Sequence, residues 1–297
     1  MKQAKTTHEQ IELLKGRGML FRDESQAHHY LINISYYRLK GYWWDLQIDV
    51  VDHKFHPDTY FEDVINKYNF DRHLRLILFD AIERIEIALR TKMIYFLSLS
   101  HGPLWYLKDE LFYDLKKHHK NIGKLSDEFG YSQEVFIKDH KSKYGNSHDP
   151  EAWKFLEIAS MGSLSKLYKN LKYTLPEKSD IAKSMGLNMH NELSSWLESI
   201  VYVRNIIAHH SRLWSRNMVK QPKAKINNPK DWFNKPLQDV QKKRVFLIIS
   251  CMVYFCNKVT PSHQVKSKII KLFNDNPNIP IYKIGFLNDW ENEPIWK

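Results

Sequence analysis

The chain has 297 residues with 43% hydrophobic and 13% aromatic side chains, a composition that excludes a disordered protein. Only 10 glycines and 11 prolines interrupt it, which favours long helices over a turn-rich β architecture. The net charge of +11 indicates a polyanionic partner such as nucleic acid, although lysine-rich usage in an AT-rich genome produces the same balance without one.

Helix signals organise the first 58 residues. Thr6 and Glu9 form a capping box that predicts a first helix directly after them. A second helix is predicted over residues 23–41. Residues 42–58 lack helical periodicity and predict a short hairpin or a packed loop. We interpret residues 1–58 as a helical extension that packs on the main domain.

Residues 59–276 carry the strongest helical pattern and are interpreted as the main domain, followed by a tail over 277–297. Apolar residues recur at steps of three and four over 60–99. This pattern predicts one long amphipathic helix, or two helices with a break near Asp71. Gly102 and the proline after it are expected to end this element.

The rest of the main domain is also predicted to be helical. Residues 108–148 carry eight lysines against seven acids and are typical of short solvated helices, to which we assign no function. Further helices are expected over 150–171, with a break at Gly162, and over 191–210, 238–258 and 263–274. The sequence therefore predicts an all-α fold, a bundle of long helices with smaller helices around it.

Two features predict the compartment. Cys251 and Cys256 are five residues apart on one predicted helix, a spacing that does not allow a disulfide, so we expect reduced core cysteines. The N-terminus carries no apolar signal segment, and the longest near-apolar stretch, residues 245–256, is too short to span a bilayer. We expect a soluble, cytoplasmic protein without a membrane partner.

The helix predicted over 191–210 ends in an unusual concentration of polar side chains, RNIIAHH. At 100° per residue most of its apolar residues fall on one face, while Asn205 and His209 share a different stripe with Tyr202. Arg204 projects from the apolar face and requires a partner or a cleft, because an isolated buried charge is costly.

Glu86, on the long helix, is the candidate partner of Arg204. It is equally placed to pair with Arg90, four residues further along the same helix, so both pairings stay open.

Arginine, asparagine and histidine together suit phosphate chemistry. Histidine accepts and donates protons near neutral pH, and arginine binds phosphate oxygens and stabilises charge that develops on them. RNA supplies its own nucleophile, the 2′-hydroxyl, so the set Arg204, Asn205 and His209 predicts RNA cleavage without a metal or other cofactor. The alternative interpretation is a helix C-terminus whose basic residues complement the helix dipole.

The segment after this helix is strongly basic. From Arg204 to Arg244 there are 11 lysines and arginines and two acids, which predicts contacts with an RNA backbone. The candidate RNA-binding residues are Arg212, Arg216, Lys220, Lys223 and Lys225. The aromatic residues Trp214, Trp232 and Phe233 of this segment either stack on unpaired bases or pack against the protein. The 15 histidines show no metal-ligand spacing, so no metal site is predicted.

Four blocks of the chain, in order, resemble the Abi-like family of bacterial abortive-infection proteins: INISYYRLKGYWW, YNFDRHLRLILFDAIERIEIALRT, PEAWKFLEIASMGSLSKLY and VRNIIAHHSRLWSR. The string RNIIAH resembles the R-x4-H motif of the HEPN superfamily of ribonucleases. The resemblance implies a HEPN-like four-helix core and a homodimer in which two motifs form one composite site.

On this resemblance Arg204 binds the scissile phosphate, Asn205 orients it and His209 transfers protons, with growth arrest on phage infection as the outcome. His210 matches the family's second histidine, and a packed or capping role is its alternative. Ser215 stands where the family often has asparagine. Glu86, Tyr202 and His210 are thus candidate supporting residues.

Two functions from different classes follow. The first is a metal-independent endoribonuclease that acts as a toxin or defence effector; the second is a non-catalytic HEPN-like module that holds a regulatory RNA on the same basic surface. A third interpretation is a component whose dimer face binds another protein. A nuclease requires restraint, for which a bound RNA, an antitoxin protein and an inactive dimer geometry are the candidates.

Overall fold

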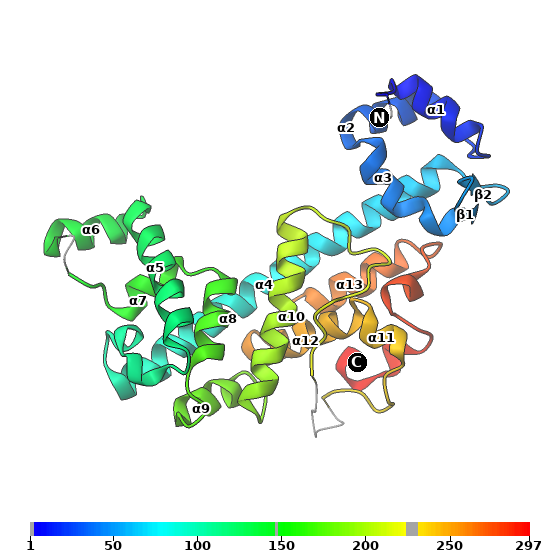
Figure 1. Cartoon of the computed structure of the whole chain (residues 1–297). Helices are drawn as coiled ribbons and strands as arrows, with labels where there is room; N and C mark the ends of the chain where they lie inside the picture. Colours follow the sequence, from blue (N-terminus) through cyan, green and yellow to red (C-terminus); the bar gives the residue numbers. More distant parts are fainter. Residues whose placement is uncertain (1–2, 146–147, 224–230) are drawn as a thin grey trace.

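The computed structural model describes residues 3–145, 148–223 and 231–297, and these form an all-α protein with one small two-stranded sheet (Figure 1). The prediction of an all-α bundle is confirmed. Across the described ranges no helix combines the length and the apolar content needed to cross a bilayer.

The helix α4 (Phe61–His101) is the axis of the fold and runs through it without a break (Figure 1). It buries a continuous stripe of apolar residues, on which α3, α8, α9, α10, α12 and α13 pack. Of the two alternatives for this segment, the single helix is correct. Asp71 does not interrupt it, because its side chain points into the protein and is fully buried. The helix ends at Gly102, which has the left-handed φ of 82° that suits glycine.

The N-terminal segment contains the helices α1 (Thr7–Lys15), α2 (Glu24–Ile34) and α3 (Tyr36–Trp43). The capping box of Thr6 and Glu9 is present as predicted. The prediction of one helix over 23–41 is wrong, because the chain turns at Ser35, whose φ is 74° and whose hydroxyl caps α3. The predicted hairpin is present as the antiparallel strands β1 (Gln47–Asp49) and β2 (Lys54–Phe55).

Five helices follow α4 along the chain: α5 (Leu115–Tyr131), α6 (Val135–Tyr144), α7 (Ala152–Phe155), α8 (Met161–Asn170) and α9 (Pro176–Ser184). Of these, α7, α8 and α9 pack on α4. The chain does break between α7 and α8, but not at the predicted Gly162. The helix α8 begins after Ser160, which is its N-cap, and Gly162 lies inside the first turn of that helix. The helix α9 was not predicted.

The remaining helices are α10 (His190–Ala208), α11 (Asp239–Lys243), α12 (Phe246–Val259) and α13 (Val265–Asn274). The single helix expected over 238–258 is two, separated at the extended residue Arg244. Cys251 and Cys256 are free and buried in α12. The segment 277–297, expected as a tail, buries a group of apolar side chains: Phe286, Trp290, Ile295 and Trp296.

Seven short 3-10 helices complete the described part of the chain: η1 (Trp44–Leu46), η2 (Trp105–Leu107), η3 (Asp109–Leu111), η4 (Leu156–Ile158), η5 (Ile281–Ile284), η6 (Trp290–Asn292) and η7 (Pro294–Trp296).

Candidate functional site

The predicted motif occupies the C-terminal end of α10. The apolar face predicted for this helix is buried, including Trp196, Ile200 and Val203. Asn205 and His209 are exposed on the polar stripe, and the backbone N–H of His209 donates to the Asn205 carbonyl at 3.1 Å. The four-residue spacing therefore places both side chains on one exposed face of the last helical turn.

His210 closes the helix in a conformation that usually requires glycine. Its φ is 53°, its N–H donates to Ile207 O at 2.9 Å, and Ser211 N–H donates to Ile206 O at 2.8 Å. These two hydrogen bonds are those of a Schellman motif, with His210 at the left-handed position. The backbone of His210 thus has the capping role considered for it, while its imidazole is exposed.

The residues after the motif are fixed by an arginine from the N-terminal segment. Arg38, on α3, donates through Nη1 to the carbonyl oxygen of His210 at 2.6 Å. The Tyr-Tyr-Arg-Leu block of the sequence is therefore in direct contact with the end of the motif, although 172 positions separate the two residues.

Asp71 fixes the next part of the same loop from α4. Its carboxylate accepts hydrogen bonds from the backbone N–H groups of Trp214 at 2.7 Å and Leu213 at 3.1 Å, and from the Tyr42 hydroxyl at 2.7 Å. Arg75 lies 3.4 Å from it on the same helix. Burial raises the pKa of Asp71, and the hydrogen bond from Tyr42 and the charge of Arg75 oppose that rise.

Two of the predicted RNA-binding arginines belong to this loop structure. The half-buried Arg212 donates to the carbonyl oxygen of Trp214, and Arg216 Nε donates to the carbonyl oxygen of Arg212 at 2.8 Å. A Cβ atom on Gly41 would lie 3.1 Å from Arg212 Nε, so glycine in the α3 block leaves room for this guanidinium. Arg212 and Arg216 therefore hold the loop through their side chains.

The other predicted RNA-binding residues differ in position. Lys220 and Lys223 are exposed, and Lys225 lies outside the described residues. Trp214 is fully buried against Phe70, and Trp232 stacks on Trp196 with 5.2 Å between ring centroids. For these two tryptophans the packed alternative is the one observed. Phe233 is half-buried and packs on Trp232 in the same cluster.

Glu86 pairs with Arg90 at 3.1 Å, which is the second of the two alternatives considered for it. Arg90 also donates to the carbonyl oxygen of Ala159, so it is held between α4 and the turn before α8. Burial raises the pKa of Glu86, while the charge of Arg90 and, more weakly, that of Arg204 act in the opposite direction. Arg204 therefore lies near Glu86 without forming an ion pair with it.

The guanidinium of Arg204 is half-buried and makes no ion pair or hydrogen bond with any residue in the described ranges. Tyr202 is also half-buried on the same helix. Arg204 is thus a cation at the edge of the protein core, at the same end of α10 as the exposed Asn205 and His209, and such a cation is suited to receive an anion.

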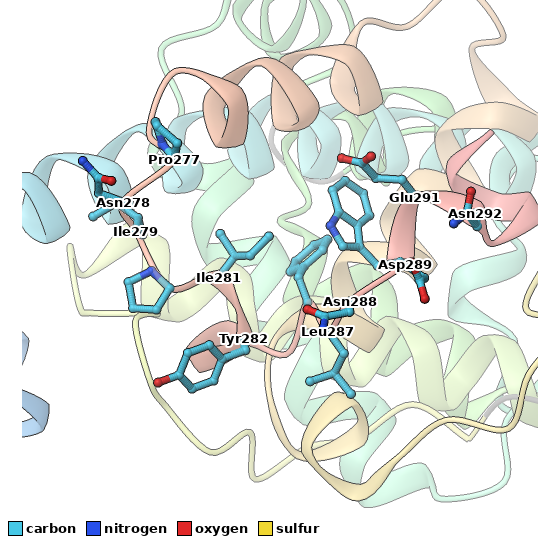
Figure 2. A pocket seen from close by; sticks show the side chains of 13 residues that line it. Pro277, Asn278, Ile279, Ile281, Tyr282, Leu287, Asn288, Asp289, Glu291 and Asn292 are labelled. Atoms are coloured by element: carbon cyan, nitrogen blue, oxygen red, sulfur yellow. The ribbon is translucent and has the colours of Figure 1, made fainter.

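No group of three His, Cys, Asp or Glu side chains suitable for a metal ion occurs within the described residues. One cavity, of about 540 Å³, lies within the C-terminal segment 277–292 (Figure 2). Its only charged lining residues are Asp289 and Glu291, both acidic, so it does not extend the candidate site toward an anion. The part of the site that sequence reasoning missed is the support formed by Arg38, Tyr42 and Asp71.

These features define an all-α protein in which an Arg/Asn/His set ends a central helix and a buried aspartate holds the loop behind it. The sequence model of the Abi-like protein family matches residues 29–215, more than half of the chain, and the chain belongs to this family. The matched range includes Arg38 and Asp71 together with the residues that they contact, His210, Leu213 and Trp214. No curated protein and no solved structure matches the chain.

Proposed function

We propose that the protein is a metal-independent endoribonuclease that acts in abortive infection, the defence against phage to which the family's name refers. The observation that carries the proposal is the arrangement at the end of α10. There, an arginine without a partner among the described residues lies on the helix that presents Asn205 and His209 to solvent.

In the proposed reaction the 2′-oxygen of a ribose attacks the adjacent phosphorus, and the bond from phosphorus to the 5′-oxygen of the next nucleotide breaks. His209 takes the proton of the 2′-hydroxyl or supplies one to the leaving oxygen. Arg204 stabilises the charge that builds on the non-bridging oxygens, and Asn205 orients the phosphate. The products carry a 2′,3′-cyclic phosphate and a 5′-hydroxyl.

The reaction requires removal of a proton from the 2′-hydroxyl and delivery of a proton to the leaving oxygen, and a single histidine performs only one of these at a time. We therefore further propose a homodimer in which two motifs form one site. The surface of α4 beside Glu86 supports this proposal. Phe79, two turns before Glu86 on the same line of the helix, is 48% exposed, and Ile87 is 50% exposed. Exposed large apolar side chains beside a candidate site are typical of an interface.

The test is cleavage of a mixed RNA pool by the wild type, His209→Ala and the control His56→Ala, each with EDTA present. His56 is an exposed histidine outside the motif. We expect cleavage with cyclic phosphate ends for the wild type and the control, and at least about 100-fold less for His209→Ala. Equal cleavage by all three proteins would exclude this site.

The second candidate function is RNA binding without catalysis. The exposed Lys220 and Lys223, shortly after the motif, favour it because both provide cations for phosphate contacts. No cleavage by any of the proteins, with RNA co-purifying equally with each, is the result expected of such a module. A regulatory RNA would then be the natural partner in the cytoplasm, whereas an antitoxin protein remains a candidate partner of the nuclease.

A further inference from the structure

A second cavity, of about 920 Å³, lies between α5, α8 and the segment that follows α8. Its lining is dominated by lysine, with six such residues from three parts of the chain: Lys117, Lys120, Lys124, Lys166, Lys169 and Lys178. The acids that line it are Asp114 and Glu198. Such an excess of cations creates a positive potential that favours a multiply charged anion over a cation.

Lys178 is the most informative of these lysines because it is buried, with 5% of its surface exposed. Its ammonium group donates to the carbonyl oxygens of Leu171 at 2.6 Å and Lys169 at 3.1 Å, and pairs with no carboxylate in the described residues. Burial, and then the charge of Lys169, lower the pKa of Lys178 to about 8. A buried cation without a counterion is costly, and an anion in the cavity would supply that counterion.

The cations nearer the rim differ in how they are paired. Lys117 pairs with Asp114 at 2.7 Å, and Lys169 pairs with Glu198. Lys120 and Lys166, from α5 and α8 respectively, are exposed and form no ion pair with a described residue. They are therefore available to an incoming ligand without the loss of an existing contact.

The cavity also offers aromatic surface. Tyr113 and Tyr173 both line it, and they are 77% and 68% exposed. A volume of this size accommodates a ligand larger than a single phosphate ion. Lysines together with exposed tyrosines are the combination that holds the phosphates and the base of a nucleotide.

We propose that this cavity binds nucleotide phosphates, either of a free nucleoside triphosphate or of a single-stranded RNA, with a base stacked on Tyr113 or Tyr173. The site is separate from the motif. Glu198, at its edge, precedes His209 by 11 residues on α10, which corresponds to about 16 Å along the helix. The proposal does not depend on the nuclease activity.

The test is a binding titration with the double variant Lys120→Gln/Lys166→Gln, the wild type and the matched control Lys116→Gln. Lys116 is an exposed lysine of α5 that does not line the cavity. The two probes are ATP and a short 5′-phosphorylated RNA whose riboses are all 2′-O-methylated. That RNA has no free 2′-hydroxyl to attack, so binding is measured whether or not the motif cleaves RNA.

We expect the double variant to bind at least one probe about tenfold more weakly than the wild type and the control, because two phosphate contacts are lost. If the RNA is the ligand, the slope of log affinity against log salt falls by about 1.4 for two lost contacts. Binding of ATP but not of the RNA assigns the site to a free nucleotide. Equal affinity of all three proteins, or no binding of either probe by the wild type, would overturn the proposal.

Discussion

His210 carries a backbone conformation that costs an L-amino acid about 1–2 kcal/mol relative to the right-handed region. Because this residue closes α10 in a Schellman motif, glycine would adopt the same conformation with less strain. We predict that His210→Gly raises the free energy of unfolding by about 1 kcal/mol. Urea denaturation measures this.

His210→Ala is the matched control, since it removes the same imidazole and keeps the unfavourable φ. We expect no stabilisation from it. Cleavage retained in both variants would assign His210 to the cap alone, whereas cleavage lost in both would assign its exposed imidazole to the chemistry. A glycine variant less stable than the wild type would contradict the strain argument.

Lys178 makes the free energy of unfolding depend on pH. Its pKa is about 8 in the folded protein and 10.5 in its ordinary state. Below about pH 8 the Lys178 side chain is charged in the folded and in the unfolded protein, so the full cost of burying the charge is present. Between about pH 8 and about pH 10.5 the side chain is neutral in the folded protein and still charged in the unfolded chain. This contribution therefore becomes more favourable as the pH rises from about 8 toward about 10.5.

We predict that the difference in unfolding free energy between wild type and Lys178→Met grows in favour of the wild type over the alkaline range. Chemical denaturation of both proteins between about pH 7 and about pH 9.5 measures it. Because wild type and variant share all other titrating groups, the difference between their unfolding free energies isolates the contribution of Lys178. A difference that does not change with pH would show that Lys178 titrates normally.

At the scale of elements, the carboxylate of Asp71 joins three of them: α4, which carries it, α3 through Tyr42, and the loop after α10 through Leu213 and Trp214. Removal of this carboxylate leaves two buried backbone N–H groups and a hydroxyl without their acceptor. We predict that Asp71→Ala lowers the free energy of unfolding by about 3–5 kcal/mol and abolishes cleavage.

The control for this prediction is a double-mutant cycle with Tyr42→Phe. Tyr42→Phe alone should cost about 1 kcal/mol, and close to nothing when Asp71 is already alanine, because the hydrogen bond it removes is then absent. Additive effects of the two substitutions would show that the Tyr42 hydroxyl and Asp71 act separately.

The helices that pack through one face were predicted well from sequence. The apolar stripes of α4 and α10 repeat at the helical period, and burial in the structure follows them. The break at Ser35 was not predicted, and the break before Ser160 was predicted two residues too late, at Gly162. Each is a serine that caps a helix inside a longer helical pattern, and the local sequence does not show where the chain must turn to pack.

The candidate site was predicted only in part for a similar reason. Arg204, Asn205 and His209 stand together in the sequence and carry a recognisable spacing. The residues that hold the loop after the motif, such as Asp71, lie far from it in the sequence and contact it only after folding. From the sequence alone, Asp71 therefore indicated only a possible break in the long helix. The lysine-lined cavity could not be predicted because residues 108–148 as a whole carry a nearly balanced charge. The lysines of α5 form a cationic site only where the fold brings them beside those of α8.

At the scale of the whole molecule, the proposed homodimer makes a direct prediction. A glutamate at Phe79 together with one at Ile87 would place two charges in the proposed interface, where burial of an unpaired charge is unfavourable. We expect Phe79→Glu/Ile87→Glu to shift the protein from dimer to monomer in sedimentation and to reduce cleavage in parallel.

Leu99→Glu is the control, because Leu99 is an exposed leucine of α4 that lies on a different side of the helix from Phe79. It should leave the dimer intact. A double variant that sediments as the wild type does would exclude this surface from the interface. A monomeric variant with full activity would exclude the composite site instead.

The contacts that hold the motif loop join residues far apart in the chain: 142 positions separate Asp71 from Leu213, and 172 separate Arg38 from His210. Contacts of such long range form late in folding, after the intervening chain has been made. A ribosome that is still synthesising this protein thus carries α3 and α4 complete while their binding partner does not yet exist. If the site cleaves RNA, the newly made chain remains harmless to its own messenger and ribosome until α10 has emerged and docked.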